Sequence, residues 1–79
     1  MFKTGDIVIC VNNQNISWSN LNENLWAESL NLYEKYRIND SFIHIEIPFV
    51  LIDGRLFLAE RFETTNYIRL LKLKGFIDV

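Results

Sequence analysis

The longest regular alternation of apolar and polar residues lies between Ser41 and Ile52. Within it, Ile43, Ile45 and Ile47 are separated by polar residues, which is the period of a strand with one apolar face. A shift of register by one residue would place all three isoleucines in water, so we expect this face to point into the core. The segment is therefore predicted to form one long strand.

A tight turn follows this strand at Asp53-Gly54. An Asp-Gly pair supplies the two positive-φ positions of a two-residue type I′ turn, and the apolar runs Phe49–Ile52 and Leu56–Leu58 flank it. The pattern predicts a β-hairpin. Pro48 cannot donate a hydrogen bond to a neighbouring strand, so we expect a bulge, a sharp bend or an edge position there.

Two further segments are predicted to be extended. Ile7–Val11 is apolar on both faces, which is typical of a central strand. The segment Leu30–Ile38 has two unlike sides if it is extended: Leu32, Tyr36 and Ile38 on one, and Tyr33, Lys35 and Arg37 on the other.

Asparagine dominates the stretch between these two segments. Residues 12–24 hold six of the nine asparagines, and asparagine favours turns because it tolerates positive φ. We therefore expect a long loop after the first strand. The alternative is a short helix through Trp26, because Asn20 and Glu23 have the spacing of a capping box.

The C-terminal part is also open to two interpretations. Residues 59–62 lose the alternation, and one tight helical turn there would bring Phe62 under the sheet. Residues 65–74 fit either a helix capped by Thr65 and stopped by Gly75 or a closing strand. The adjacent Leu70 and Leu71 fit alternation poorly, which favours the helix.

Length and composition restrict the classes of protein. Seventy-nine residues make a single domain, residues 1–79, and 49% hydrophobic residues with eleven aromatics suffice for a core. The lone Cys10 indicates a reducing, cytoplasmic location, and we expect neither a secretory signal nor a membrane segment. The net charge of −2 gives no overall attraction for nucleic acid.

Candidate catalytic groups are few. His44 and Glu46 would share the outward face of one strand, which is more typical of a solvated pair than of acid-base chemistry without a third partner. Cys10 with His44 would supply a nucleophile and a base, but nothing in the sequence places them together. With one Cys, one His and three scattered glycines we expect no metal, no cofactor and no enzymatic activity.

Three stretches together carry a resemblance to a known family: FKTGDIVIC at residues 2–10, LNLYEKYRI at residues 30–38 and GRLFLAERF at residues 54–62. They resemble small SH3-like barrels, common in phage and prophage genomes, with a Lys-x-Gly-Asp-x-Val start, a Leu-Thr-x-Gly-Lys-x-Tyr-x-Val strand and a terminal Arg-Phe turn. Tyr33 departs from the pattern, which often has glycine there. The Asn-rich insertion and the tail beyond Phe62 have no counterpart in it.

The resemblance implies a mainly β fold, a small SH3-like (KOW-like) barrel of about five strands. The sequence pattern adds to it a long Asn-rich loop after strand 1 and a C-terminal helix. The lack of catalytic groups and the two tryptophans favour a non-enzymatic protein-binding module. The resemblance implies that this module is phage-encoded and acts as an accessory protein or inhibitor on a host protein. In such barrels the long loop flanks the usual peptide groove. The related KOW type implies the alternative, a nucleic-acid-associated accessory domain.

The candidate partner-binding residues lie in and after the Asn-rich loop: Trp18, Trp26, Glu28 and Tyr33. Exposed tryptophans are typical anchors for a protein partner or for a second copy in a homodimer, but closing one end of the core is an equally good role for each. For the nucleic-acid alternative the candidates are Arg69, Lys72 and Lys74, which also fit a solvated helix face.

Overall fold

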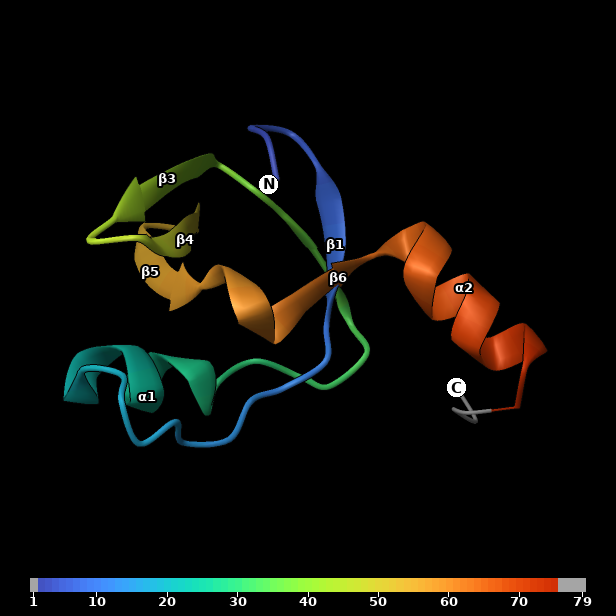
Figure 1. Ribbon diagram of the computed structural model, residues 1–79, viewed down its shortest axis with the longest axis horizontal. Helices are drawn as coiled ribbons and strands as arrows, with labels where there is room; N and C mark the ends of the chain where they lie inside the picture. The colour runs from blue at the N-terminus through green and yellow to red at the C-terminus, as the bar shows by residue number, and fades with distance from the viewer. Residues whose placement is uncertain (1, 76–79) are drawn as a thin grey trace.

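Strands dominate the computed structural model, which describes residues 2–75 apart from the side chains at positions 67, 68 and 71. Over these residues, six strands form two three-stranded antiparallel sheets (Figure 1). The first sheet has the order β2-β1-β6 and the second the order β3-β4-β5. The strand bounds are β1 (Ile7–Cys10), β2 (Lys35–Arg37), β3 (Asp40–His44), β4 (Ile47–Ile52), β5 (Arg55–Leu58) and β6 (Phe62–Thr64).

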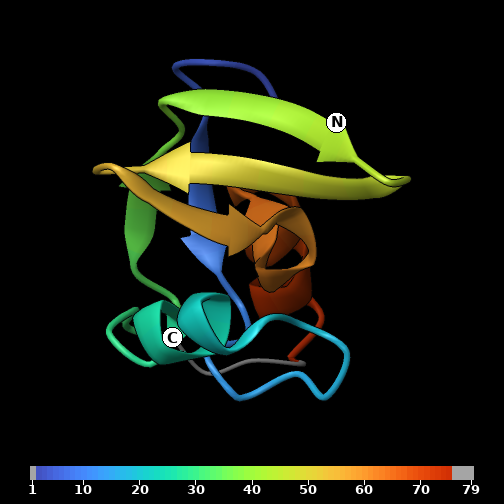
Figure 2. The same ribbon diagram turned by 90° about the vertical axis from the view of Figure 1, so that its left-hand side faces the viewer.

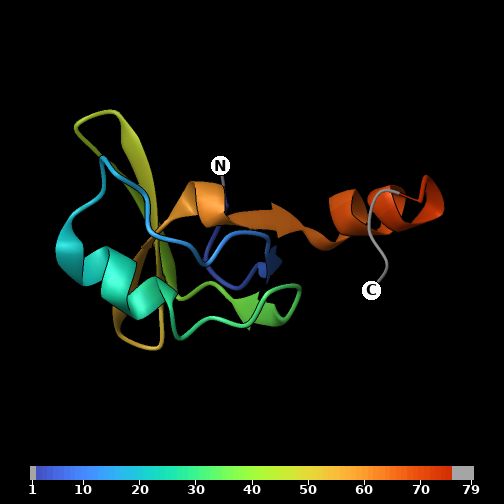
Figure 3. The same ribbon diagram turned by 90° about the horizontal axis from the view of Figure 1, so that it is seen from below.

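Three helical segments accompany the sheets: α1 (Leu21–Ala27), the 3₁₀ turn η1 (Ala59–Arg61) and α2 (Thr65–Leu73). Helix α1 lies beside the second sheet, and α2 lies on the far side of the first sheet (Figures 1 and 3). No helix in the described part of the chain has the length and apolar character needed to cross a membrane.

The chain passes from one sheet to the other at Ile38 and Asn39. The backbone of Ile38 bonds to the start of the first sheet, accepting from Gly5 N at 2.7 Å and donating to Asp6 O at 2.9 Å. The next residue bonds to the second sheet, with Asn39 N donating to Leu51 O at 2.8 Å. The strands of the second sheet run across β1 (Figure 2), as in sheets that share a corner-turning strand.

The core fills the space between the two sheets. Strands β1, β4, β5 and β6 contribute buried apolar side chains to it, and Phe62 meets Tyr36 and Phe57 edge to face with ring centroids 6.2 and 6.1 Å apart. The buried cluster consists of Val8, Cys10, Ala27, Leu30, Ile38, Val50, Ile52, Phe57, Ala59 and Phe62. Helix α1 therefore closes one end of the core through Ala27.

The Asp53-Gly54 hairpin is confirmed. Both residues have positive φ, 51° and 77°, and the register brings Ile52 opposite Arg55 across the turn. The pairing joins β4 to β5 as the sequence predicts. It fixes the inward face of β4, because Val50 and Ile52 are buried.

The prediction of a single long strand from Ser41 to Ile52 is wrong. The chain folds back at Ile45-Glu46, where φ is 49° and 64°, and separates β3 from β4. Ile43 and Ile45 are 60% and 79% exposed instead of buried. A continuous strand that buried Ile52 would also turn every second residue before it, including Glu46, toward the core. Folding back keeps this carboxylate in water.

Pro48 lies at a local edge of the sheet without a bulge. It pairs with Ile43 in regular register, while the pairing of β4 with β5 reaches only to Phe49 and Leu58. Next to a two-residue turn the His44–Ile47 pair is hydrogen-bonded, so the Ile43–Pro48 pair is not. The proline nitrogen therefore faces the side where β5 has already ended.

The helical alternatives at residues 20–27 and 65–73 are the ones that form. Asn20 caps α1, its Oδ1 accepting from Glu23 N at 2.7 Å, so the prediction of a loop throughout residues 12–24 is wrong. The tight turn before Phe62 and the helix beginning at Thr65 are confirmed. Gly75, at φ 78°, donates to Lys72 O at 3.0 Å beyond the helix end.

Candidate functional site

Helix α1 is inverted relative to an ordinary amphipathic helix. Its inward face buries Glu23, Asn24 and Ala27, whereas Leu21 and Leu25 on its outward face are 71% and 54% exposed. These two leucines are four residues apart and therefore adjacent on the helix surface. A short helix normally stabilises a small domain by burying such leucines. The cause of the inversion lies beneath the helix.

That cause is Arg61 of η1, whose side chain is fully buried. All five of its N–H donors are used. Nε and Nη2 donate to the two oxygens of Glu23 at 2.5 and 2.9 Å, and Nη2 also donates to Asn24 Oδ1 at 3.0 Å. Nη1 donates to the backbone oxygens of Asn12 and Gln14 at 3.2 and 2.7 Å. A buried guanidinium with this set of partners is electrically and geometrically satisfied.

The Glu23 carboxylate is satisfied as well. Besides Arg61, it accepts from Ser19 Oγ at 2.7 Å and from Leu58 N at 3.0 Å. Burial by itself raises the pKa of this carboxyl, but the hydrogen bonds from Arg61, from the Leu58 amide and from Ser19 outweigh burial and hold the pKa below its usual value. Glu23 is therefore ionised at neutral pH and pairs with a permanent cation.

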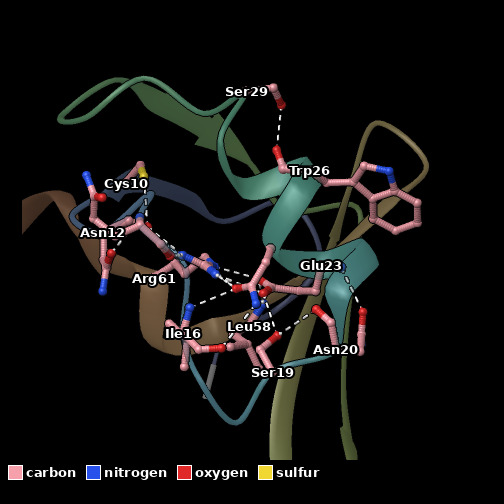
Figure 4. A network of polar contacts seen from close by, with 12 residues as sticks. Cys10, Asn12, Ile16, Ser19, Asn20, Glu23, Trp26, Ser29, Leu58 and Arg61 are labelled. Carbon is pink, nitrogen blue, oxygen red and sulfur yellow. Dashed lines mark hydrogen bonds and ion pairs between the residues drawn. The ribbon is translucent and has the colours of Figure 1, made fainter.

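The Asn-rich loop is fixed by the same network (Figure 4). Asn24 clamps Ile16, whose backbone N donates to Asn24 Oδ1 at 2.8 Å and whose O accepts from Asn24 Nδ2 at 3.1 Å. Together with the bonds from Arg61 to Asn12 and Gln14, these contacts fix the backbone of the segment that precedes α1 at residues 12, 14 and 16. Polar contacts with buried side chains therefore order this part of the loop.

Three large apolar side chains of this segment and of α1 are exposed to solvent. We call Trp18, Leu21 and Leu25 the Trp18–Leu25 surface; Trp18 is 54% exposed. Next to it, Trp26 is half-buried and packs against the core cluster. Trp26 and Leu21 line an open cavity of about 380 Å³ together with Asn20, Asn22 and Leu56. In Figure 4 the indole of Trp26 points away from the Glu23–Arg61 pair.

The four predicted partner-binding residues do not form one site. Glu28 is exposed and caps the C-terminal end of α1, seven residues after Leu21 and so on the same helix stripe. Tyr33 lies elsewhere: its backbone N donates to Cys10 O at 2.7 Å, its φ is 65°, and it is half-buried. Sequence reasoning missed Leu21 and Leu25: their spacing after a capping residue indicates one face of a helix, but not that this face is exposed.

The candidate catalytic groups are separated. Cys10 is fully buried in β1; burial raises the pKa of its thiol, and its Sγ donates to Asn12 O at 3.6 Å. His44 is exposed at the end of β3, and Glu46 lies in the turn that follows, so the two do not share one strand face. Among the described residues no group of three His, Cys, Asp or Glu side chains is placed to hold a metal.

The basic candidates are only partly brought together. Arg69 and Lys72 line a cavity of about 170 Å³ beside α2, where Lys35 of β2 joins them. Lys74 is exposed beyond the end of α2 and is not among the lining residues. Two of the three basic residues named from the sequence, Arg69 and Lys72, therefore lie at one cavity. Lys35, which is far from α2 in the chain, was not among them.

Comparisons of the chain with protein-family models, with curated proteins and with solved structures found no match. Function is therefore inferred from the surfaces and contacts described above.

Proposed function

We propose that this chain is a non-enzymatic protein-binding module built on an SH3-like barrel, and that it binds its partner through the Trp18–Leu25 surface. Three features support the barrel. The strand order β2-β1-β6 and β3-β4-β5 becomes five strands if β2 and β3 are counted as one strand bent at Ile38 and Asn39. A 3₁₀ turn precedes the last strand. Tyr33 adopts positive φ where the family pattern has glycine.

The inversion of α1 carries the functional proposal. Leu21 and Leu25 expose apolar surface that a monomer would normally bury. Covering this surface with a partner stabilises the complex by about 25 cal/mol for each Å² of apolar area removed from water. The network beneath the helix holds the leucines in place before binding, so little ordering entropy is lost on association. Trp18 supplies an exposed aromatic anchor of the kind that dominates binding energy at protein interfaces.

The side chains of this surface indicate which groups the partner should present. Glu28 stands at the end of the Leu21–Leu25 stripe, so the partner is expected to present apolar side chains beside a lysine or arginine. The open cavity lined by Trp26 and Leu56 has room for one of those apolar side chains. The resemblance to phage-encoded barrels makes a host protein the expected source of the partner.

A capture experiment with matched variants tests the proposal. The protein is immobilised and incubated with host lysate, and any captured protein is identified by mass spectrometry, purified and titrated. We expect Trp18→Ala to weaken binding by about 2 kcal/mol or more while changing the free energy of unfolding by at most about 1 kcal/mol. Leu21→Ser should weaken binding as well, because it removes an exposed apolar contact.

Leu73→Ser is the matched control, since Leu73 is a comparably exposed leucine on α2. Equal binding by the wild type and by Leu21→Ser, or a loss caused only by Leu73→Ser, would contradict the assignment of the surface. Sedimentation at several concentrations distinguishes a second copy of the chain from a different partner. A dimer dissociated by Leu21→Ser would make this surface a homodimer contact instead.

A further inference from the structure

We propose that the cavity between α2 and the first sheet is a binding site for a pyrophosphate-type oxyanion. This site is separate from the Trp18–Leu25 surface. Helix α2 lies on the outer face of the first sheet, opposite the second sheet and α1 (Figures 1 and 3). A cavity of about 170 Å³ lies there, lined by Ile9, Lys35, Thr65, Arg69 and Lys72.

Two elements bring the three cations together. On α2, Thr65, Arg69 and Lys72 follow one another at intervals of four and three residues and so form one stripe of the helix. Lys35 of β2 stands opposite Ile9 of β1 in the sheet register, and Ile9 forms the apolar floor between them. The side chains therefore converge on one small space from both sides.

Among the residues that the structure describes, the cations around this cavity are not paired with a carboxylate. No carboxylate is among the lining residues, and within the described part of the chain Lys35, Arg69 and Lys72 form no ion pair. Glu63 of β6 also pairs with Ile9, so its side chain lies on the same face of the sheet as Lys35, but it is one strand beyond Ile9 and does not line the cavity. In a protein with a net charge of −2, three cations around one cavity, none of them in an ion pair with a described residue, form a local site for an anion.

Size and shape select the ligand. The cavity is smaller than the roughly 300 to 1,000 Å³ of sites that enclose drug-sized molecules, so the base and sugar of a nucleotide would remain outside. The stripe from Thr65 to Lys72 extends about 10 Å along the helix axis, which is longer than one phosphate requires. Arginine binds phosphate oxygens in a bidentate manner, lysine acts as a point charge, and the Thr65 hydroxyl adds a donor.

Titration of the intact protein with inorganic pyrophosphate, followed by two-dimensional NMR at constant ionic strength, tests this site. We expect saturable amide shifts centred on Ile9, Lys35 and residues 65–72, with inorganic phosphate binding about tenfold more weakly because it makes fewer contacts. Lys35→Gln and Arg69→Gln should each weaken pyrophosphate binding by about tenfold. Lys74→Gln is the matched control and should change it less than twofold.

Thermal melts of the same variants distinguish a lost ligand contact from a lost fold. Shifts that rise linearly without saturation, or an equal effect of Lys74→Gln and Arg69→Gln, would show only general ionic attraction and overturn the proposal. A single-stranded oligonucleotide without terminal phosphates separates the two sources of phosphate. If it binds at these residues and pyrophosphate does not displace it, the cavity is a contact for a nucleic-acid backbone and the proposal is wrong.

Discussion

Replacing Glu23 by glutamine tests the physical basis of the inverted helix. Glu23→Gln keeps the shape of the side chain but removes the negative charge that faces Arg61. One of the two carboxylate oxygens becomes an NH₂ group, which cannot accept a hydrogen bond. The side chain thus loses one bond from Arg61 together with the bond from the Leu58 amide, if Oε1 is replaced, or from Ser19, if Oε2 is replaced. The guanidinium remains buried without a counter-ion.

The expected loss is large compared with the stability of the domain. Removing one partner of a buried ion pair costs about 3 to 5 kcal/mol, because it leaves an uncompensated charge in the interior. A chain of 79 residues has a total free energy of unfolding of roughly 4 to 12 kcal/mol. Glu23→Gln should therefore move the urea midpoint by roughly 2 M or more, as followed by far-UV circular dichroism.

The pH dependence of the same measurement gives an independent signature. The pKa of Glu23 is lower in the folded protein than its ordinary value of about 4.3 in the unfolded chain. The stability that it contributes is thus complete above about pH 4.3 and is lost as the pH falls through the lower, folded pKa. The difference between the wild type and Glu23→Gln should shrink in that acidic range.

Two further variants make the result decisive. Glu28→Gln changes an exposed glutamate at the end of the same helix and should alter stability by at most about 0.5 kcal/mol. Combining Glu23→Gln with Arg61→Met removes both charges, and the double variant should recover part of the loss. If Glu23→Gln costs less than about 1 kcal/mol and shows no acid dependence, the pair is solvated and the explanation of the inversion fails.

Two predictions concern the turns of the second sheet. Gly54→Val should lower the free energy of unfolding by about 1 to 3 kcal/mol, because a β-branched residue resists the φ of 77°; an unchanged melting curve would contradict the turn geometry. Ile45→Asn should raise the free energy of unfolding by about 0.5 to 1.5 kcal/mol, and with it the melting temperature, because asparagine tolerates the φ of 49° and the isoleucine is mostly exposed. A lower melting temperature for Ile45→Asn would mean that the isoleucine makes contacts that offset its strain.

Local signals in the sequence predicted the elements whose cause is local. Asp53-Gly54 determines its own turn, and the adjacent leucines at 70 and 71 disfavour a strand, so both outcomes follow from neighbouring residues. The turn at Ile45-Glu46 has no such signal, since neither residue favours positive φ. The turn forms because a continuous strand that buried Val50 and Ile52 would also turn Glu46 toward the core. Which face of β4 is buried depends on the whole sheet and not on the residues next to the turn.

The candidate surface was harder to predict for the same reason. Trp18 and Glu28 are exposed as a binding role requires, but Leu21 and Leu25 look like core residues in any reading of the helical period. Their exposure depends on Arg61, which is distant in sequence and belongs to a residue class that is mostly exposed. No local sequence pattern predicts that an arginine from a distant part of the chain will be buried beneath this helix.

The two possible orientations of α1 can be compared through the groups that each would bury. Turning the helix over would bury Leu21 and Leu25, which stabilises by about 1.5 to 3 kcal/mol for each leucine. It would also carry Glu23 into water and leave Arg61 buried without its counter-ion, at about 3 to 5 kcal/mol. The Leu58 amide would lose its acceptor, and leaving it buried without one destabilises the fold by about 1 to 3 kcal/mol more. The gain of about 3 to 6 kcal/mol is an upper limit, because Leu21 and Leu25 are already partly buried, and the loss of about 4 to 8 kcal/mol offsets it. The buried Arg61 thus accounts for the exposure of the two leucines.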